Sequence, residues 1–433
     1  MARQPDLGVG TRGLRTALAS HGNEGYRVSS YELELDYRIG PNRLSARAKI
    51  TAVASVALSR FTLDLSGFKV GGVHVDGRAA KFSRSGTKLT VRPARPVAGK
   101  FVVEVRYSGN PKPIGGRWGD IGWDELTDGV LVASQPIGAP SWFPCNDHPA
   151  DKASYRVTLT TSSAYAVLVT GDLVSRQTGA STTTWVYERR EPTATYLMSV
   201  QIGRYEDLAM PQAQRLAVPR RLVPQARHDF ARQPEMAALF SRLFGPYPFG
   251  EYIVVVTDDD LEDPVEAQGM AIFGRNHVDG KRTHERLVAH ELAHQWFGNS
   301  LTIADWPYIW LNEGFATYAE WLWSEESGGP PAAELARQWR ARLSSLPADL
   351  VIADPGEANL FDERVYKRGA LTLHALRAAV GDGVFFQILR SWAEAHRHAT
   401  VTTAQFVAHA EARAGQPLRE LFTAWLETPA LPG

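Results

Sequence analysis

The sequence predicts an α+β protein, in which an N-terminal antiparallel β saddle or sandwich precedes a domain that ends in helices. Two patterns support this expectation. From about Tyr26 to Tyr205, short segments alternate apolar and polar residues and are separated by Gly, Asn, Asp or Pro, which is typical of antiparallel strands. From His284 onward, apolar residues instead recur every three or four positions, the spacing of packed amphipathic helices.

The predicted strands follow one another through the first half of the chain. They include "SYELELDYRI", "RFTLDLSGFKVGGVHVDG", "GKFVVEVRYSG", "ASYRVTLTTS" and "TTTWVYERRE", which are rich in the β-branched and aromatic residues that favour strands. Alternation fades at "MPQAQRLAVPRRLVPQARHDFARQPEM", where proline and arginine accumulate, although a strand can still run through this stretch. We therefore predict two domains, residues 1–203 and 204–433.

Composition indicates an ordinary globular protein. Of 433 residues, 44% are hydrophobic and 22% charged, and 47 basic residues balance 47 acidic ones, so no net field attracts nucleic acid or a membrane surface. The single cysteine, Cys145, excludes an intrachain disulfide framework and fits a reducing compartment. Neither a signal-peptide run nor the ~20 apolar residues that span a bilayer are present. We therefore expect a cytoplasmic protein without nucleic-acid or membrane partners.

The stretch "HELAHQWFGN", residues 290–299, points to a metal. Positions four apart lie on one face of a helix, so His290 and His294 can bind one ion, with Glu291 beside them. Two surface histidines are the alternative, but the next helical run, "WPYIWLNEGFATYAEWLW", offers Glu313, 18 residues beyond the pair. Two histidines and a glutamate leave a position open for water at a catalytic zinc. We predict one Zn²⁺ there, which lowers the pKa of water toward ~7.

Two residues of the second helix can support these ligands. Glu320 lies seven residues after Glu313 on the same helical face, where it can accept the free N–H of a zinc histidine and fix its tautomer. A surface glutamate is an equally good interpretation. Asn312 either orients the neighbouring backbone or simply begins the helix.

The segment "HELAHQWFGNSLTIADWPYIWLNEGFATYAEWLW" resembles the M1 family of zinc aminopeptidases, the gluzincins that include aminopeptidase N and leukotriene A4 hydrolase. The likeness extends to "RLFGPYPFGEY", to "SWFPCNDHPADKASYRVTLT", which is similar to the family's FPC-x-D-x-P-x-x-K stretch, and to "VYKRGALTLHALRAAVGDGVFF", which is similar to its tyrosine-bearing helix. The resemblance runs from about Gly22 to the end of the chain. It implies a thermolysin-like zinc peptidase domain ending in helices for the second half.

The resemblance also implies a role for each matching residue. The two histidines and Glu313 match the zinc ligands, and Glu291 matches the general base. Tyr366, in "VYKRG", matches the tyrosine whose hydroxyl stabilises the tetrahedral oxyanion, a task suited to a neutral donor. Gln135, nine residues before Pro144 of "FPC", matches a glutamine or glutamate that contacts the substrate N-terminus. A strand glutamine with its own hydrogen bonds is the alternative for Gln135.

The family's exopeptidase signature, G-x-M-E-N, has no literal counterpart in this chain. In "EDPVEAQGMAIFG", laying "QGM" on "GxM" puts Ala271 at the position of the amine-binding glutamate, and amine recognition is lost. Laying "DPVEA" on the signature puts Glu266 there and places Gly269 on a glycine that is common in the family. This register also leaves 24 positions between Glu266 and His290, as in some members. We prefer the second register, and with it Glu266.

Even in that register the signature is altered. Asp263 and Pro264 replace its small first pair, and the proline removes an N–H from an edge that should pair with an extended peptide. Many relatives also add a large helical C-terminal domain, whereas this chain stops close to where the catalytic domain should end. A more open cleft, or a cover from a second subunit, is therefore expected.

Together these residues predict a zinc-dependent metalloaminopeptidase that hydrolyses the N-terminal peptide bond of peptides with a free N-terminus. In this hypothesis Glu291 deprotonates a zinc-activated water, Tyr366 stabilises the oxyanion, and Gln135 and Glu266 hold the substrate amine. The altered signature favours one alternative, a zinc endopeptidase or other zinc hydrolase without strict amine recognition. A non-catalytic scaffold with the same fold conflicts with the intact ligands, base and tyrosine.

Overall fold

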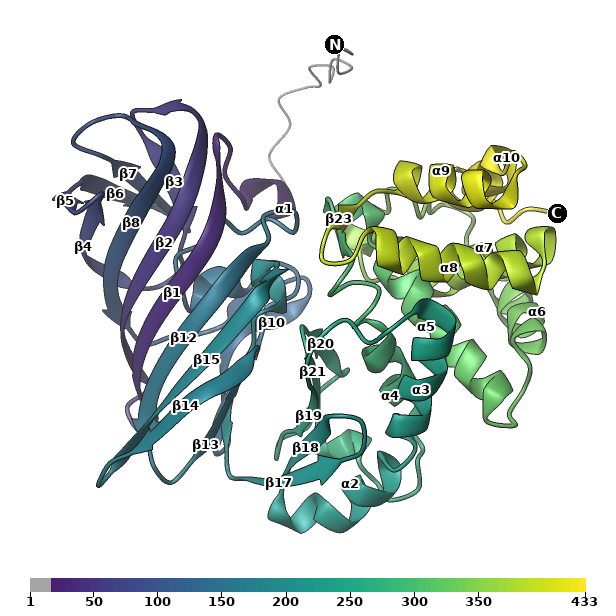
Figure 1. The fold of residues 1–433 in the computed structure, drawn as a ribbon, viewed down its shortest axis with the longest axis horizontal. Coiled ribbons are helices and arrows are strands. Elements are labelled where there is room, and N and C mark those ends of the chain that lie inside the picture. The colour runs from purple at the N-terminus through teal and green to yellow at the C-terminus, as the bar shows by residue number, and fades with distance from the viewer. Residues whose placement is uncertain (1–16) are drawn as a thin grey trace.

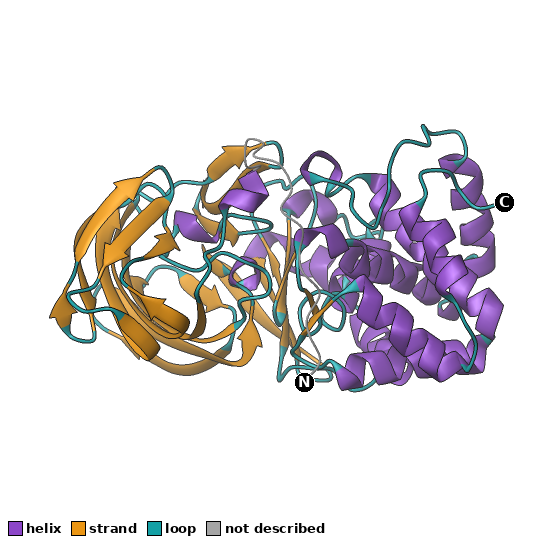
Figure 2. Cartoon of the chain, turned by 90° about the horizontal axis from the view of Figure 1, so that it is seen from above, coloured by secondary structure: helices purple, strands orange, loops and turns teal. Residues whose placement is uncertain are grey.

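The computed structural model describes residues 17–433 and confirms the α+β class. A β-rich part lies at one end of the long axis, the helices lie at the other, and a mixed sheet lies between them (Figure 1). The view from above shows the same separation of strands and helices (Figure 2). The boundary that we predict, between residues 203 and 204, lies between the strands β16 and β17.

The β-rich part is built on an eight-stranded sheet, in which only β1 and β12 pair in parallel among the described strands. In spatial order the strands are β14 (Asp172–Thr178), β15 (Thr182–Thr193), β12 (Ala153–Ser162), β1 (Tyr26–Arg38), β2 (Arg43–Leu58), β8 (Val97–Gly109), β4 (Lys69–Val75) and β5 (Arg78–Ala79). Alternation sets which face is buried, since Leu33 and Leu35 of β1 point into the core while Glu32 and Glu34 are exposed.

Two smaller antiparallel sheets complete this part. One contains β13 (Ala166–Val169), β16 (Val200–Gly203), β11 (Gly129–Ala133), β10 (Gly119–Leu126) and β9 (Ile114–Gly116). The other contains β3 (Phe61–Asp64), β7 (Lys88–Arg92) and β6 (Lys81–Ser85). One apolar core joins all three sheets, and it includes the fully buried rings of Tyr31, Trp123 and Trp142.

A mixed sheet links the β-rich part to the helices. Its order is β17 (Tyr205–Met210), β18 (Gln214–Pro219), β19 (Tyr252–Val256), β21 (Met270–Phe273) and β20 (Val265–Ala267). Strands therefore do run through the proline- and arginine-rich stretch. An apolar cluster that includes Leu131 and Leu168 from the β-rich part and Ile253 and Ile272 from this sheet packs the two together. The edge strands of the sheet are β17 and, on the side that carries Glu266, β20.

The helices lie at the end of the molecule opposite the β-rich part (Figure 1). They are α2 (Val223–Asp229), α3 (Gln233–Phe244), α4 (Glu285–Ala293), α5 (Trp310–Glu326), α6 (Ala332–Leu343), α7 (Glu363–Val380), α8 (Asp382–Ala395), α9 (Thr403–Ala414) and α10 (Arg419–Phe422), after α1 (Ala17–Ser20) at the start of the described chain. Helix α5 is buried on all sides from Trp310 to Trp323, so other elements enclose it. Among the described residues, no helix is long and apolar enough to cross a membrane.

Candidate active site

Helices α4 and α5 bring the three predicted metal ligands together. The Nε2 atoms of His290 and His294 each lie 3.4 Å from Oε2 of Glu313, and all three side chains are buried. Zn–N and Zn–O bonds measure about 2.0–2.2 Å, so two ligand atoms of a tetrahedral zinc ion lie about 3.3–3.4 Å apart. The residues therefore fit a zinc ion without rearrangement.

The second ring nitrogen of each histidine is already bonded. Nδ1 of His290 lies 2.7 Å from Oε1 of Glu320, and Nδ1 of His294 lies 3.1 Å from the carbonyl oxygen of Phe297. When Nδ1 carries the proton and donates it to these acceptors, Nε2 keeps its lone pair for a metal. Of the two interpretations of Glu320, the structure favours a partner of the ligand over a surface residue, because this side chain is buried.

Two cationic side chains stabilise the negative charge of Glu320. Its carboxylate lies 3.4 Å from Arg286 and 3.8 Å from Lys367. Burial alone would raise the pKa of Glu320, but Lys367 and the His290 hydrogen bond together lower it to about 2. A permanently ionised acceptor keeps the imidazole of His290 oriented.

Glu291 lies beside the metal ligands, and its environment differs from that of Glu320. It is buried, and its Oε2 has no hydrogen-bond partner within residues 17–433. Burial raises the pKa of the Glu291 carboxyl above its ordinary value. A buried carboxylate with a free oxygen and a raised pKa is suited to accept a proton near neutral pH.

Glu266 and Gln135 meet across the two parts of the molecule. Gln135 follows β11 and donates from Nε2 to Oε1 of Glu266 on β20, at 2.7 Å. Carboxylate or imidazole atoms of Glu266, Glu291 and His294 all lie within 4.8 Å of one another. In the β20–β21 hairpin, Glu266 pairs directly with Ala271, so the two candidate positions for the amine-binding glutamate stand side by side and only Glu266 offers a carboxylate.

Tyr366 reaches the site because α5 and α7 cross at two glycines. A Cβ on Gly314 would lie 2.8 Å from the Cα of Gly369, closer than any side chain permits. The crossing places the Tyr366 ring 6.0 Å from that of His290, nearly parallel to it. Burial and the carboxylates around it, Glu313 first, raise the pKa of Tyr366 well above its ordinary value. The hydroxyl is therefore a neutral donor at physiological pH.

Sequence reasoning missed residues that hold β20 against α4. Gln295 accepts from the backbone N–H of Gly269 at 2.8 Å and donates to the carbonyl of Ala267 at 3.2 Å. Asn299 donates to the same carbonyl at 2.9 Å. Both lie in the "HELAHQWFGN" stretch itself, and their position next to the metal ligands is the signal that could have identified them. A fixed β20 keeps Glu266 at a set distance from the metal ligands.

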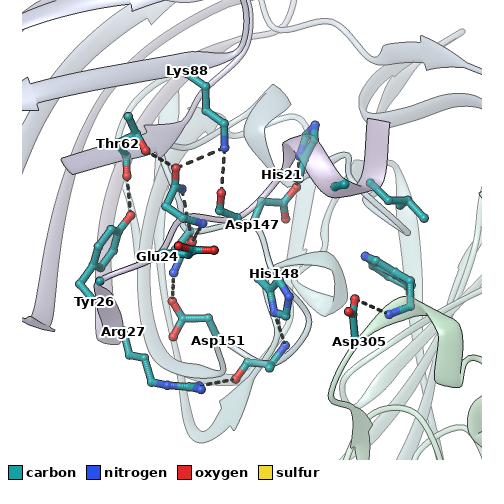
Figure 3. Close-up of a pocket in the computed structure, with 18 of the residues that line it drawn as sticks. His21, Glu24, Tyr26, Arg27, Thr62, Lys88, Asp147, His148, Asp151 and Asp305 are labelled. Atoms are coloured by element: carbon teal, nitrogen blue, oxygen red, sulfur yellow. Dashed lines mark hydrogen bonds and ion pairs between the residues drawn. The ribbon is translucent and has the colours of Figure 1, made fainter. Parts of the chain in front are cut away.

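A cavity of about 1560 Å³ lies elsewhere, between α1, residues 146–151 and the loop around Asp305. None of the predicted site residues lines this cavity. Several of its charged groups bond to neighbouring protein groups (Figure 3), as in the contact of 2.8 Å between His21 and Asp147 and that of 3.2 Å between Arg27 and the carbonyl of Ala150. We assign no ligand to it.

Comparison with known proteins agrees with this geometry. Residues 28–197 match the Peptidase M1 N-terminal domain and residues 231–425 match the Peptidase family M1 domain. A crystal structure of a variant M1 zinc metallopeptidase from Deinococcus radiodurans, bound to the substrate Tyr-Ser-Ala, superposes with a TM-score of 0.86 at 30% identity, covering 95% of this chain and 96% of that one.

Curated relatives are more distant in sequence. Aminopeptidase M1-D of rice, Oryza sativa, is 25% identical over 71% of this chain and 38% of its own length. The leucyl aminopeptidase of the archaeon Saccharolobus solfataricus is 24% identical over 83% of this chain and 48% of its own length. This chain thus spans less than half the length of either relative.

The fold and the site together have the arrangement of the M1 zinc metallopeptidase structure from Deinococcus radiodurans. Both family domains and the bacterial structure match this chain, and these matches identify its family. The chain belongs to peptidase family M1, and the predicted resemblance is confirmed.

Proposed function

We propose that this protein is an aminopeptidase that removes single residues from the free N-terminus of peptides. The observation that carries the proposal is the carboxylate of Glu266, held by Gln135 at 2.7 Å and within 4.8 Å of the Glu291 carboxylate and the His294 imidazole. One residue of extended peptide spans about 3.3–3.6 Å. An α-amine bound at Glu266 therefore leaves room for one residue before the scissile carbonyl.

His290, His294 and Glu313 would hold one zinc ion per chain. When bound, the ion supplies Lewis-acid chemistry to the attacking water and the scissile carbonyl. The acceptors at Nδ1, Glu320 for His290 and the Phe297 carbonyl for His294, favour this use of the histidines, since they leave both Nε2 atoms unprotonated.

The remaining residues transfer the proton and stabilise the charge that develops on the substrate. Glu291 accepts a proton from the attacking water and returns it to the leaving amine, as its free, buried oxygen permits. Tyr366 donates a hydrogen bond to the oxyanion as it forms, a task for which its raised pKa keeps the hydroxyl protonated. Glu266 and Gln135 orient the α-amine of the substrate, and the carboxylate provides the charge.

Timed mass spectrometry of a digest tests this proposal. One peptide is supplied with its N-terminus either free or acetylated, and the expected result is stepwise loss of single residues from the free form alone. Glu266→Gln should lower kcat/KM for the free peptide by about 10- to 100-fold, because a charge-assisted hydrogen bond is worth about 1.5–3 kcal/mol. The control is Glu262→Gln, which neutralises an exposed carboxylate four residues earlier and should change little.

One observation favours the alternative, a zinc hydrolase without strict amine recognition. Pro264 stands immediately before the edge strand β20 and has no N–H to offer a substrate backbone. Equal cleavage of the free and acetylated peptides, or internal cuts, would establish that alternative and reject the aminopeptidase.

A further inference from the structure

A lysine of the β-rich part reaches the turn that follows α4. Lys152, the last residue of "FPCNDHPADK", lies directly before β12 and has no role in the mechanism above. Its Nζ donates to the carbonyl of Asn299 at 3.3 Å and to that of Ser300 at 2.8 Å. Within residues 17–433, no other hydrogen bond joins the β-rich part to the turn at residues 297–301.

The partners of this lysine are unusual for a cation. Within the described chain Lys152 forms no ion pair, so its amine leaves water for two backbone carbonyls alone. Lysine is seldom buried without a paired charge, because removing the ammonium from water is costly. The contact therefore adds little to stability by itself, and what needs explaining is where the two carbonyls lie.

The backbone on either side of Lys152 is fixed to the eight-stranded sheet. The carboxylate of Asp151 accepts from the backbone N–H of Val28, on β1, at 3.0 and 3.2 Å. Ala153 pairs with Thr193 of β15. Because both neighbours are held, the lysine side chain extends from a rigid base.

The turn that Lys152 contacts also supports a metal ligand. The carbonyl oxygen of Phe297 lies 3.1 Å from Nδ1 of His294 and is the acceptor that keeps the proton on that nitrogen. Gly298 has a φ of +124°, and a Cβ built on it would lie 3.1 Å from the same Nδ1. The turn is therefore packed directly against the imidazole, and a shift of its backbone would move the acceptor of the ring.

The same turn holds the strand of the proposed amine-binding glutamate. Nδ2 of Asn299 donates to the carbonyl of Ala267 at 2.9 Å, and Ala267 follows Glu266 on β20. Lys152 thus contacts the backbone of the residue whose side chain fixes β20.

We propose that Lys152 is a positioning residue for both halves of the active site: it fixes the turn at residues 297–300, which orients the metal ligand His294 and holds the strand that carries Glu266. Through this side chain the β-rich part acts on residues that the catalytic domain carries. The half of the inference that concerns the amine rests on the proposed function, whereas the metal half can be tested without any substrate.

The test of the metal half compares Lys152→Met with Lys88→Met in the full chain. Lys88 is a matched control, because it is also partly buried in the β-rich part and donates to a backbone carbonyl, that of Gly22 at 2.9 Å, but has no bond to the turn. Zinc affinity is measured by competition with a chromophoric chelator. We expect Lys152→Met to weaken zinc binding by about 10-fold, as loss of support for a metal ligand does. Lys88→Met should leave zinc affinity unchanged, even if it lowers stability.

Kinetics with a peptide substrate tests the amine half. Lys152→Met should raise KM for a peptide with a free N-terminus by about 10-fold, because small misplacements of a binding group are costly. Asn299→Ala removes the link to β20. If Lys152 acts through that link, the double variant raises KM no further than the larger of the two single changes. Independent, multiplied increases in KM would overturn this half.

Zinc affinity of Lys152→Met equal to that of Lys88→Met would overturn the inference, even if Asn299→Ala fails to fold. So would an unaltered chain that binds no zinc. Failure of the proposed function has a separate sign. Lys152→Met would then still weaken zinc binding, while the unaltered chain would cleave free and acetylated peptides alike or cleave neither.

Discussion

Two buried clusters of histidine and carboxylate differ in how many of their polar atoms are paired. The N-terminal cluster comprises His21, Asp64, Lys88, Asp147 and Asp151. The catalytic cluster comprises His290, Glu291, His294, Glu313 and Glu266. In the first, Asp64 accepts from the backbone of Gly22 and Asp147, from Asn23 and from Lys88.

In the catalytic cluster, by contrast, Oε2 of Glu291 has no partner in the described chain, and neither does the side-chain amide of Asn312, one residue before Glu313. The number of acids and histidines therefore does not distinguish a site from a structural cluster. What distinguishes it is the set of polar groups that are desolvated and left free. A saturated cluster stabilises the fold, whereas an unsaturated one is available to a metal, a water or a substrate.

Replacing Glu291, whose carboxylate has an unpaired oxygen, gives the sharpest test of the contrast between the two clusters. Glu291→Gln should lower kcat by about 10²- to 10⁴-fold, the usual contribution of a general base, while zinc content stays the same. Its free energy of unfolding should stay equal or rise, because an unpaired buried charge is lost. Turnover of an N-terminal anilide substrate, metal analysis and chemical denaturation measure the three quantities. A variant that kept a substantial rate would remove Glu291 from the role of base.

In the N-terminal cluster the same kind of change should have the opposite effect. Asp64→Ala is expected to lower the free energy of unfolding by about 3–5 kcal/mol, because it leaves Lys88 and several buried N–H groups without their acceptor. The activity of each folded molecule should persist. Denaturant unfolding with activity normalised to the folded fraction decides this, with Asp36→Ala, an exposed carboxylate on β1, as the control. A stable but inactive Asp64→Ala would show that the first cluster also takes part in catalysis.

Tyr366→Phe removes a donor that lies beside the catalytic cluster, next to His290, without removing a charge. We expect kcat to fall by about 10²- to 10³-fold, with little change in KM, since the hydroxyl acts on charge that develops in the transition state. Steady-state kinetics over a range of substrate concentrations measures both constants. An effect on KM alone would mean that Tyr366 only binds substrate.

The last prediction concerns Lys152, which follows Asp151 of the N-terminal cluster and contacts the segment after His294 of the catalytic cluster. Its ammonium donates to the carbonyls of Asn299 and Ser300, at 3.3 and 2.8 Å, and burial lowers the pKa of Lys152 from 10.5 to about 7. Between these values the unfolded chain holds a proton that the folded chain has lost, so stability rises with pH by up to about 1.4 kcal/mol per unit. Lys152→Met should lose that rise. Denaturant unfolding between pH 7 and pH 10 measures the slope, and equal slopes would contradict the assignment.

Local spacing was sufficient for the metal half of the site. His290, His294 and Glu320 lie on predicted helices, whose period determines which side chains share a face. The strands of the β-rich part follow from alternation in the same way, as in β1. For such elements the sequence pattern predicts which side chains lie together, because the contacts are made within one helix or between neighbouring ones.

The residues proposed to bind the substrate amine were harder to predict, because their contacts join distant parts of the sequence. Gln135 and Glu266 are 131 residues apart in sequence, and no periodicity connects them. Choosing Glu266 over Ala271 depended on a resemblance, and in the structure the two residues face each other across the β20–β21 hairpin.

The glycine crossing of α5 and α7 has a consequence for motion. With backbones in contact at Gly314 and Gly369, neither helix can slide or roll past the other without a steric clash. The first turn of α5, with Glu313, and the side chain of Tyr366 are therefore expected to move as one rigid body. Gln295 and Asn299 also hold β20 next to the metal ligands, so substrate-driven closure would act at the contact between Gln135 and Glu266, adjusting the grip on the amine and leaving the catalytic geometry constant.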